Sequence, residues 1–275
     1  MNPPIVHPVR LGAVDYLNVR PLVAGLNRDP MFSLRFDPPS VCATLLRDGE
    51  IDLGMIPSIA YQHHESYRVV FDIAIASDGP VASVALFTRV PVPRIRSIAA
   101  DTSSNTSVAL LRVLCAEHFH ITPEIRPAAP DLKSMLSNAD AALLIGDPAL
   151  FADHEGLGVE KVDLGAEWTA LTGLPFVWAF WAGRRDAVDS AAIERLLDAK
   201  REGLAASDAI ADDYAAAYSA RTGIPADAEL ARRYLRENIK YDLGVREVTA
   251  LGRFYEAALR AGVIPRVQPV RLFAS

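Results

Sequence analysis

The chain has 275 residues, a formal net charge of −6, 51 % hydrophobic residues and 23 % charged residues. This composition excludes a disordered protein, and a chain of this length buries enough surface to fold without a disulfide or a metal staple. The acidic balance disfavours a nucleic-acid partner, because such partners usually bind a basic face of a protein. The length is compatible with one large domain or with two lobes.

Strands and helices are expected to alternate in the first part of the chain. The expected elements are a strand at 9–14, a helix at 21–26, an edge strand at 34–36, a helix at 41–47 and a strand at 51–56. Pro21 suits the first turn of its helix, and Ser40 is expected to cap the next one. Asp48-Gly49 is expected to end that helix. An alternating order of this kind is typical of an α/β fold.

The same order of elements is expected again after residue 95. The second set comprises a strand at 95–100, a helix at 107–118, an extended segment at 123–127, a helix at 132–136 and a strand at 139–145. The spacing repeats as well, since Asn18 and Ser58 are 40 positions apart, and so are Thr106 and Gly146. All four follow predicted strands, whose carboxyl ends bind ligands in open α/β sheets. A chance likeness between two α/β stretches is the alternative.

The remaining segments predict how the two halves are joined. Residues 69–92 are expected to form two strands around the turn Ser77-Asp78-Gly79-Pro80. A further strand and four helices are expected at 176–181, 191–206, 208–220, 227–238 and 245–261. The pattern predicts two α/β lobes, with the chain crossing near residue 90 and returning near residue 178. Residues 1–90 and 178–275 would form the first lobe, and residues 91–177 the inserted second lobe.

No targeting or membrane-spanning segment is recognisable. Residues 1–10 contain three prolines and lack the apolar run of about 7–15 residues that a secretory peptide needs. The longest apolar stretch, at 176–182, is far shorter than the roughly 20 residues of a membrane helix. Cys42 and Cys115 stand alone and are compatible with a reducing compartment. We therefore expect a soluble cytoplasmic protein without a membrane partner.

Motifs for metals and nucleotide cofactors are missing from the sequence. His63-His64-Glu65 are adjacent, so their side chains diverge, and His118 and His120 lie at a helix end, where a cation is favourable anyway. No GxGxxG follows a predicted strand, and neither a P-loop nor a GxSxG motif occurs. We expect neither a metal nor a cofactor.

The most informative segment is the hydroxyl-rich stretch at 102–107, which precedes a predicted helix. Its five hydroxyls and one amide exceed what a single helix cap requires. Free N–H groups and the helix dipole favour an anion at such a place. Ser104, Asn105, Thr106 and Ser107 are therefore candidate anion ligands, and a capped surface helix is the alternative.

The matching loops supply four further candidates. Asn18 can both donate and accept hydrogen bonds. Ser58 and Gly146 complete the rim of the expected site. Asp147 has three possible roles: it caps the next helix, orients its loop or faces the ligand.

Two more candidates lie close to these loops. Ser83 follows a turn and is expected to point into a cleft between the lobes. Arg20 is solvated at the surface by default, but it is the arginine best placed to approach a carboxylate ligand.

Six blocks of sequence carry a family resemblance. They are Tyr16–Leu22 (YLNVRPL), Gly49–Ser58 (GEIDLGMIPS), Ser77–Val84 (SDGPVASV), Ser107–Arg112 (SVALLR), Ala141–Asp147 (AALLIGD) and Leu171–Val177 (LTGLPFV). In this order they resemble the chorismate dehydratase family, which serves the futalosine route to menaquinone. The resemblance is dense over residues 9–185 and loose in the helical tail.

The resemblance implies a fold and a reaction. The fold is that of type 2 periplasmic solute-binding proteins, with two α/β lobes, a central cleft and here a helical C-terminal tail. The reaction converts chorismate, a small dicarboxylate, into 3-[(1-carboxyvinyl)oxy]benzoate and water. A sister family that forms 1,4-dihydroxy-6-naphthoate shares the fold, but it carries a histidine where this chain has Ile145-Gly146-Asp147.

The resemblance also implies roles for the site residues. Asn18 and Ser83 match positions at the reacting centre and would position the leaving hydroxyl and the C3 proton. The helix start at 104–107 would bind one carboxylate, and Ser58 with nearby N–H groups the other, as preorganised donors do in many enzymes. No strong protein base is apparent, so the substrate's enolpyruvyl carboxylate is expected to take the proton.

Two other functions stay open at this point. The missing histidine disfavours the naphthoate-forming lyase. A carboxylate-binding receptor or regulator on the same fold would carry an export signal or a DNA-binding helix-turn-helix, whereas strands are expected before residue 90. An aromatic product formed from chorismate, without metal or nucleotide, distinguishes the enzyme from a binder. The oligomeric state is left open.

Overall fold

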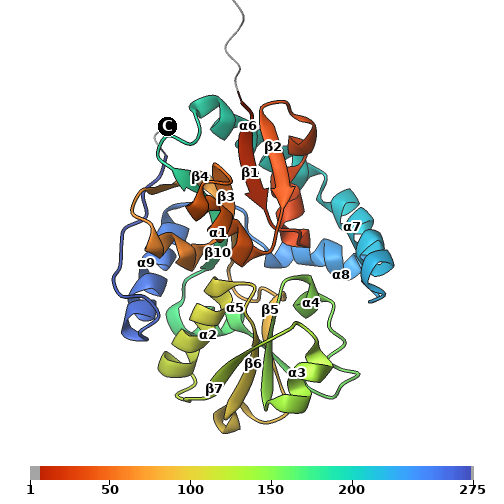
Figure 1. Ribbon diagram of the computed structural model, residues 1–275. Helices are drawn as coiled ribbons and strands as arrows, with labels where there is room; N and C mark the ends of the chain where they lie inside the picture. The colour runs from red at the N-terminus through yellow and green to blue at the C-terminus, as the bar shows by residue number, and fades with distance from the viewer. Residues whose placement is uncertain (1–6, 274–275) are drawn as a thin grey trace, which may run out of the picture.

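The fold is built from two five-stranded sheets that lie one above the other in Figure 1. The computed structural model describes residues 7–273. Residues 1–6, which belong to the N-terminal segment expected to lack a secretory peptide, lie outside the described part. The first sheet has the strand order β2-β1-β3-β10-β4, and the second has the order β7-β6-β8-β5-β9. Both are mixed sheets, as an α/β fold with an antiparallel return strand requires.

The first sheet gathers strands from both ends of the chain. Its strands are β1 (Val9–Ala13), β2 (Phe32–Phe36), β3 (Leu53–Pro57), β4 (Tyr67–Ser77) and β10 (Phe176–Arg184). β1 is parallel to β2 and β3, whereas β10 runs antiparallel between β3 and β4. Every residue of β3 is buried, which is typical of a strand covered on both faces.

The second sheet is continuous in sequence. Its strands are β5 (Val84–Thr88), β6 (Ser97–Asp101), β7 (Glu124–Ala128), β8 (Ala141–Ile145) and β9 (Glu160–Asp163). β6 is parallel to β7 and β8, and β5 is antiparallel to β8 and β9. The short, charged β9 and the helix α5 after it have no counterpart among the predicted elements, because neither shows an apolar period.

Helices cover both sheets and form the C-terminal part (Figure 1). The helices of the first two thirds are η1 (Leu17–Val23), η2 (Leu26–Arg28), α1 (Pro39–Asp48), η3 (Ser58–His63), η4 (Val92–Arg94), α2 (Asn105–Glu117), α3 (Leu132–Asn138), α4 (Asp147–Leu150) and α5 (Leu164–Thr172). The C-terminal ones are α6 (Ser190–Ala205), α7 (Ser207–Thr222), α8 (Ala228–Arg233), the π-helical turn η5 (Tyr234–Asn238) and α9 (Val245–Arg260). The four predicted C-terminal helices are confirmed, the third as α8 followed by η5.

Two predictions for the first helices are wrong. The helix expected from Pro21 is the short 3₁₀ helix η1, which begins at Leu17 and holds Pro21 inside it. Ser40 does not cap α1, because Pro38 is the N-cap and Pro39 occupies the first turn, where a proline fits best. The backbone N–H of Ser40 instead donates to the carbonyl of Ser103, 3.0 Å away.

Sheet membership bears on how the chain divides into lobes. β5 lies in the second sheet, although the division expected from sequence assigns residues 84–88 to the first lobe. β10 begins at Phe176 in the first sheet, two residues before the expected return point. We therefore propose that the chain crosses between 77 and 84 and returns between 172 and 176, in place of residues 90 and 178.

One large apolar cluster contains residues of both halves, and a smaller one lies within the second half. Trp168 of α5, Phe176 of β10 and Phe254 of α9 meet edge to face, with ring centroids 4.8–5.9 Å apart. This cluster joins an element of the second half to the first sheet and the C-terminal helix, and such aromatic pairs stabilise beyond their buried area. Among the helices in residues 7–273, none is both long and apolar enough to cross a membrane.

Candidate active site

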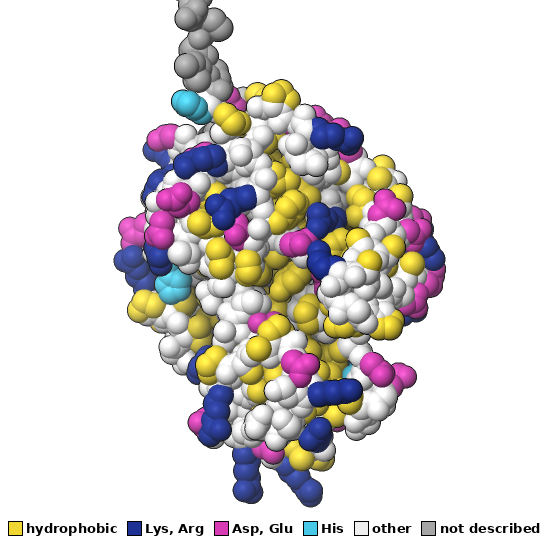
Figure 2. All heavy atoms as spheres, turned by 45° about the vertical axis from the view of Figure 1, so that its right-hand side comes forward, with side chains coloured by type: hydrophobic (Ala, Val, Ile, Leu, Met, Phe, Trp, Pro, Cys, Tyr) yellow, Lys and Arg dark blue, Asp and Glu magenta, His cyan; other side chains and the backbone are white. Residues whose placement is uncertain are grey.

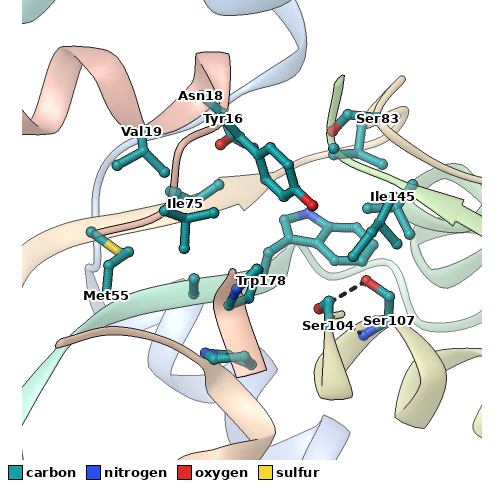
Figure 3. Close-up of a pocket in the computed structure, with 17 residues that line it drawn as sticks. Tyr16, Asn18, Val19, Met55, Ile75, Ser83, Ser104, Ser107, Ile145 and Trp178 are labelled. Carbon is teal, nitrogen blue, oxygen red and sulfur yellow. Dashed lines mark hydrogen bonds between the residues drawn. The ribbon is translucent and has the colours of Figure 1, made fainter. Parts of the chain in front are cut away.

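A pocket lies where the two sheets face each other (Figure 3). Its lining residues are Val14, Tyr16, Asn18, Val19, Pro39, Met55, Pro57, Ile75, Val81, Ser83, Val84, Ser104, Ser107, Ile145, Gly146, Trp178 and Ala179. Nine of the 17 lie at or shortly after the carboxyl ends of β1, β3, β6 and β8, the place where α/β sheets bind ligands. None of these side chains is charged.

Figure 2 shows the same character from outside the molecule. Hydrophobic side chains gather in the furrow between the upper and lower halves, whereas lysine, arginine, aspartate and glutamate are spread over the outer surface. With a formal net charge of −6, the protein offers no general attraction to an anion. An anionic ligand must therefore be held by local dipoles and hydroxyls.

Two aromatic side chains, those of Tyr16 and Trp178, form part of the pocket wall (Figure 3). Tyr16 follows β1, and burial raises the pKa of its phenol to about 12, so the phenol is neutral and can donate a hydrogen bond. Trp178 of β10 donates from Nε1 to the Ser77 hydroxyl, 3.1 Å away, which fixes the orientation of the indole. Such walls suit a flat ring with polar substituents.

Asn18 and Ser83 lie in the pocket as expected and are joined by a third residue. Asn18 Nδ2 donates to the hydroxyl of Tyr234 over 3.0 Å, and that hydroxyl donates to Ser83 Oγ over 2.7 Å. Asn18 is a lining residue, and its Oδ1 is buried and has no hydrogen-bond partner among the described residues. A buried oxygen without a partner costs free energy, so this atom is a natural contact for a ligand that donates a hydrogen bond.

The start of α2 presents the second polar group of the pocket. Ser104 is the N-cap, and its hydroxyl oxygen accepts from the Ser107 N–H at 3.4 Å and from the Ser107 hydroxyl at 3.2 Å (Figure 3). Both side chains line the pocket. The first N–H groups of a helix lack partners within it, and the dipole of this 13-residue helix favours an anion here.

Ser58 and Thr106 are placed together, but outside the pocket lining. Ser58 Oγ donates to the carbonyl of Val177 over 2.8 Å, and Thr106 Oγ1 accepts from the Ile59 N–H over 3.1 Å. The two hydroxyl oxygens are 3.5 Å apart, and both side chains are fully buried. The repeat of 40 positions therefore brings these two residues into contact, where they join η3 to the start of α2 rather than face a ligand.

Gly146 forms part of the wall directly beneath Tyr16. Its φ is +62° and its ψ −147°, a conformation that L-residues rarely adopt. A Cβ on Gly146 would lie 2.6 Å from two ring carbons of Tyr16. Glycine is therefore required both by the backbone conformation and by the ring that closes over it.

Asp147 orients the loop and does not line the pocket. Its buried carboxylate accepts from the Leu17 N–H over 3.1 Å and from the Tyr214 hydroxyl over 2.5 Å. It thus ties the loop after β8 to η1 and α7. Burial raises the pKa of this carboxyl to about 6, although the two donors counteract the shift.

Replacing Asp147 by asparagine is expected to change how stability depends on pH. The unfolded carboxyl ionises near its ordinary pKa of 3.8, whereas the folded one holds its proton up to about 6. The folded state thus binds more protons in this window, so the wild type loses stability as pH rises through it, by about 3 kcal/mol from this group. Denaturant unfolding of the wild type and of Asp147→Asn is measured at pH 4 and at pH 7. The free energy of unfolding of the wild type should fall relative to that of the variant between pH 4 and pH 7.

A second carboxyl provides the control for this experiment. The Arg96 N–H holds the pKa of Asp140 below its ordinary value, so Asp140→Asn should shift the pH dependence in the opposite direction. An unfolding free-energy difference between wild type and Asp147→Asn that is equal at both pH values would contradict the assignment.

Arg20 and Asn105 are directed elsewhere. Arg20 pairs with Asp15, and its guanidinium lies over the rings of Phe36 and Tyr214, at 4.7 and 5.2 Å from their centroids. It does not line the pocket. Asn105 borders a separate hollow between α1 and η3. Five of the ten predicted site residues thus line the pocket: Asn18, Ser83, Ser104, Ser107 and Gly146.

Three residues of the site are absent from the sequence-based set. Tyr16 begins the block Tyr16–Leu22, which also contains Asn18, so its place in the sequence indicated that it could belong to the site. Trp178 sits in a buried strand, where an aromatic residue more often serves the core. Tyr234 lies 216 positions after Asn18, and no local pattern connects the two. Within residues 7–273, no three His, Cys, Asp or Glu side chains are grouped to hold a metal ion.

A family model described as menaquinone biosynthesis matches residues 9–260. A chorismate dehydratase from Thermus thermophilus is 33 % identical over an alignment of 269 residues that covers 92 % of this chain and 96 % of that protein. The chain belongs to the chorismate dehydratase family. A chorismate dehydratase from Campylobacter jejuni is 27 % identical over 254 residues, covering 90 % of this chain and 96 % of that protein.

Solved structures show that the chorismate dehydratase family fold seen here is shared with solute receptors. A protein from Archaeoglobus fulgidus superposes with a TM-score of 0.75 at 20 % identity, covering 94 % of this chain and all of that one. The periplasmic aliphatic sulphonate-binding protein of Escherichia coli gives a TM-score of 0.67 at 19 % identity, covering 98 % and 95 %. The predicted α/β fold of the periplasmic-binding-protein type is confirmed.

Proposed function

We propose that this protein removes water from chorismate to give 3-[(1-carboxyvinyl)oxy]benzoate, in menaquinone biosynthesis by the futalosine route. The observation that carries the proposal is the near full-length match to a chorismate dehydratase at 33 % identity. No histidine stands at the end of β8, where the naphthoate-forming sister family is expected to carry one, and none lines the pocket.

The pocket suits the shape and charge of this substrate. The six-membered ring of chorismate fits between apolar and aromatic walls that include Tyr16 and Trp178. The start of α2, with Ser104 and Ser107, supplies N–H groups and a dipole for one of the two carboxylates. Helix ends and hydroxyls thus replace the arginine or lysine that a dianion usually meets.

The chemistry needs little more than placement. The C3 proton is acidic because the C1=C2 bond passes charge to the ring carboxylate. When the C3–H bond breaks, its electron pair enters the ring, the C4–O bond breaks, and an aromatic ring results. A hydroxyl both donates and accepts, so the leaving group can donate to Asn18 Oδ1 and accept from the Ser83 hydroxyl.

The proton is carried by the substrate in this scheme. No aspartate, glutamate, histidine or lysine is among the lining residues. The enolpyruvyl carboxylate takes the C3 proton and returns it to the departing hydroxyl, so one water leaves and no external acid or base is consumed. Preorganised donors around the charge that develops on the carboxylates supply the remaining stabilisation.

We also propose a cytoplasmic location and a small-molecule partner only. Cys42 and Cys115 are both free and buried, which suits a reducing compartment. Chorismate is the proposed partner, and the proposal involves no metal, cofactor, membrane or nucleic acid.

Purified protein incubated with chorismate, in the presence of a metal chelator, is expected to form an aromatic product lighter by one water. Proton NMR follows the ring signals, and mass spectrometry identifies the product. Heat-denatured protein controls for spontaneous decay of chorismate. Failure to form this product would overturn the proposal, and tight binding of unchanged chorismate would then indicate a carboxylate-binding protein.

A further inference from the structure

Tyr234 occupies the midpoint between the two residues proposed at the reacting centre. Its hydroxyl is 3.0 Å from Asn18 Nδ2 and 2.7 Å from Ser83 Oγ, and its side chain is 1 % exposed. Asn18 belongs to η1 beside the first sheet, and Ser83 directly precedes β5 of the second sheet. One phenol thus connects the two halves of the site.

The bonds of this phenol have a fixed direction. A phenol carries one proton, and Tyr234 gives it to Ser83 Oγ while accepting from Asn18 Nδ2. The amide of Asn18 is therefore held by its Nδ2, and its Oδ1 is left buried and without a partner among the described residues. Ser83 already accepts a bond, so its own proton is left for the ligand. The pocket receives one acceptor and one donor, the pair that complements a hydroxyl group.

The surrounding chain holds Tyr234 in place. The residue begins η5, a single π-helical turn, and such turns recur at functional sites. At the other end of the same turn, Asn238 Nδ2 donates to the carbonyl of Pro80 over 2.9 Å. The turn therefore makes two hydrogen bonds to the loop that carries Ser83, one to Ser83 and one to Pro80. Burial raises the pKa of Tyr234 well above its ordinary value, so the phenol keeps its proton at neutral pH.

We infer that Tyr234 is a positioning residue that orders Asn18 and Ser83 as acceptor and donor for the leaving hydroxyl. The inference rests on the proposed function. Because Tyr234 does not line the pocket, it acts through these two residues and not by contact with the substrate.

Tyr234→Phe removes the hydroxyl and keeps the ring in its packing. We expect kcat for chorismate to fall about 10²-fold, with KM within about threefold of the wild type, because the carboxylate contacts at α2 are untouched. Tyr241→Phe is the matched control, since Tyr241 is also buried and its hydroxyl has no partner among the described residues. Thermal unfolding of both variants shows that each is folded at the assay temperature.

A double variant separates positioning from a general structural effect. If Tyr234 acts through Ser83, adding Tyr234→Phe to Ser83→Ala should lower kcat by a clearly smaller factor than adding it to the wild type. Equal factors in both backgrounds overturn the inference, as does a Tyr234→Phe variant with the kcat of Tyr241→Phe. In both cases the proposed function stands, because the wild type still forms the product. A wild type that forms no product overturns the proposed function, and the inference with it.

Discussion

Turnover of chorismate is expected to fall by about 10²- to 10³-fold when Asn18 is replaced by alanine, the range found when one preorganised donor or acceptor is removed from an active site. The amide oxygen of Asn18 is a buried acceptor that has no partner among the described residues. Without it, the C4 hydroxyl of the substrate would be free to rotate. Tyr234 also loses the donor that orients its phenol. Ser83→Ala should produce a loss of similar size, because it removes the matching donor.

Steady-state kinetics with chorismate provide the measurement. Asn138→Ala serves as the control, because Asn138 is an exposed asparagine at the end of α3, far from the pocket lining. The effect on Asn18→Ala should lie in kcat more than in KM, since the hydroxyl contact strengthens as the C4–O bond breaks. Near-normal turnover in both Asn18→Ala and Ser83→Ala would remove these residues from the reacting centre.

Gly146→Ala is expected to abolish ligand binding while leaving much of the fold intact. The new Cβ would lie 2.6 Å from the ring of Tyr16, so the ring must swing away and the pocket loses a wall. The backbone at φ +62° adds strain of about 1–3 kcal/mol to the folded state. Isothermal titration with chorismate or the product, and denaturant unfolding, measure the two effects separately.

Gly158 offers a matched control for this substitution. Its φ is +63°, nearly that of Gly146, but a Cβ there would meet nothing within 4 Å. Gly158→Ala should therefore lose stability from backbone strain and keep its affinity for the ligand. If Gly146→Ala bound the ligand as tightly as Gly158→Ala, the close packing of Tyr16 on Gly146 would have no part in recognition.

Much of the fold follows from short-range patterns. Apolar runs identified β1, β3 and β8, because strands buried on both faces have little choice of composition. The hydroxyl-rich stretch before α2 was placed correctly at a helix start in the pocket, with Ser104 as its cap. Asp48-Gly49 ended α1 as expected, with Gly49 in the left-handed region.

The parts that were missed depend on long-range packing. β5 joins the second sheet because its partners, β8 and β9, lie further along the chain. Ser58 and Thr106 were expected to face a ligand, yet a buried hydroxyl can be satisfied equally well by other groups of the protein, and spacing alone does not distinguish the two cases. The guanidinium of Arg20 lies over two aromatic rings, and no sequence pattern predicts this contact.

The bridge through Tyr234 also has a consequence for how the protein is made. A ribosome releases the N-terminal part first, and elements that need distant partners must wait for them. Asn18 is synthesised 216 positions, and Ser83 151 positions, before the tyrosine that orders them. A nascent or prematurely terminated chain that ends before Tyr234 can already hold both sheets, yet it lacks the bond that sets donor and acceptor. Full activity is thus deferred until residue 234 has been synthesised.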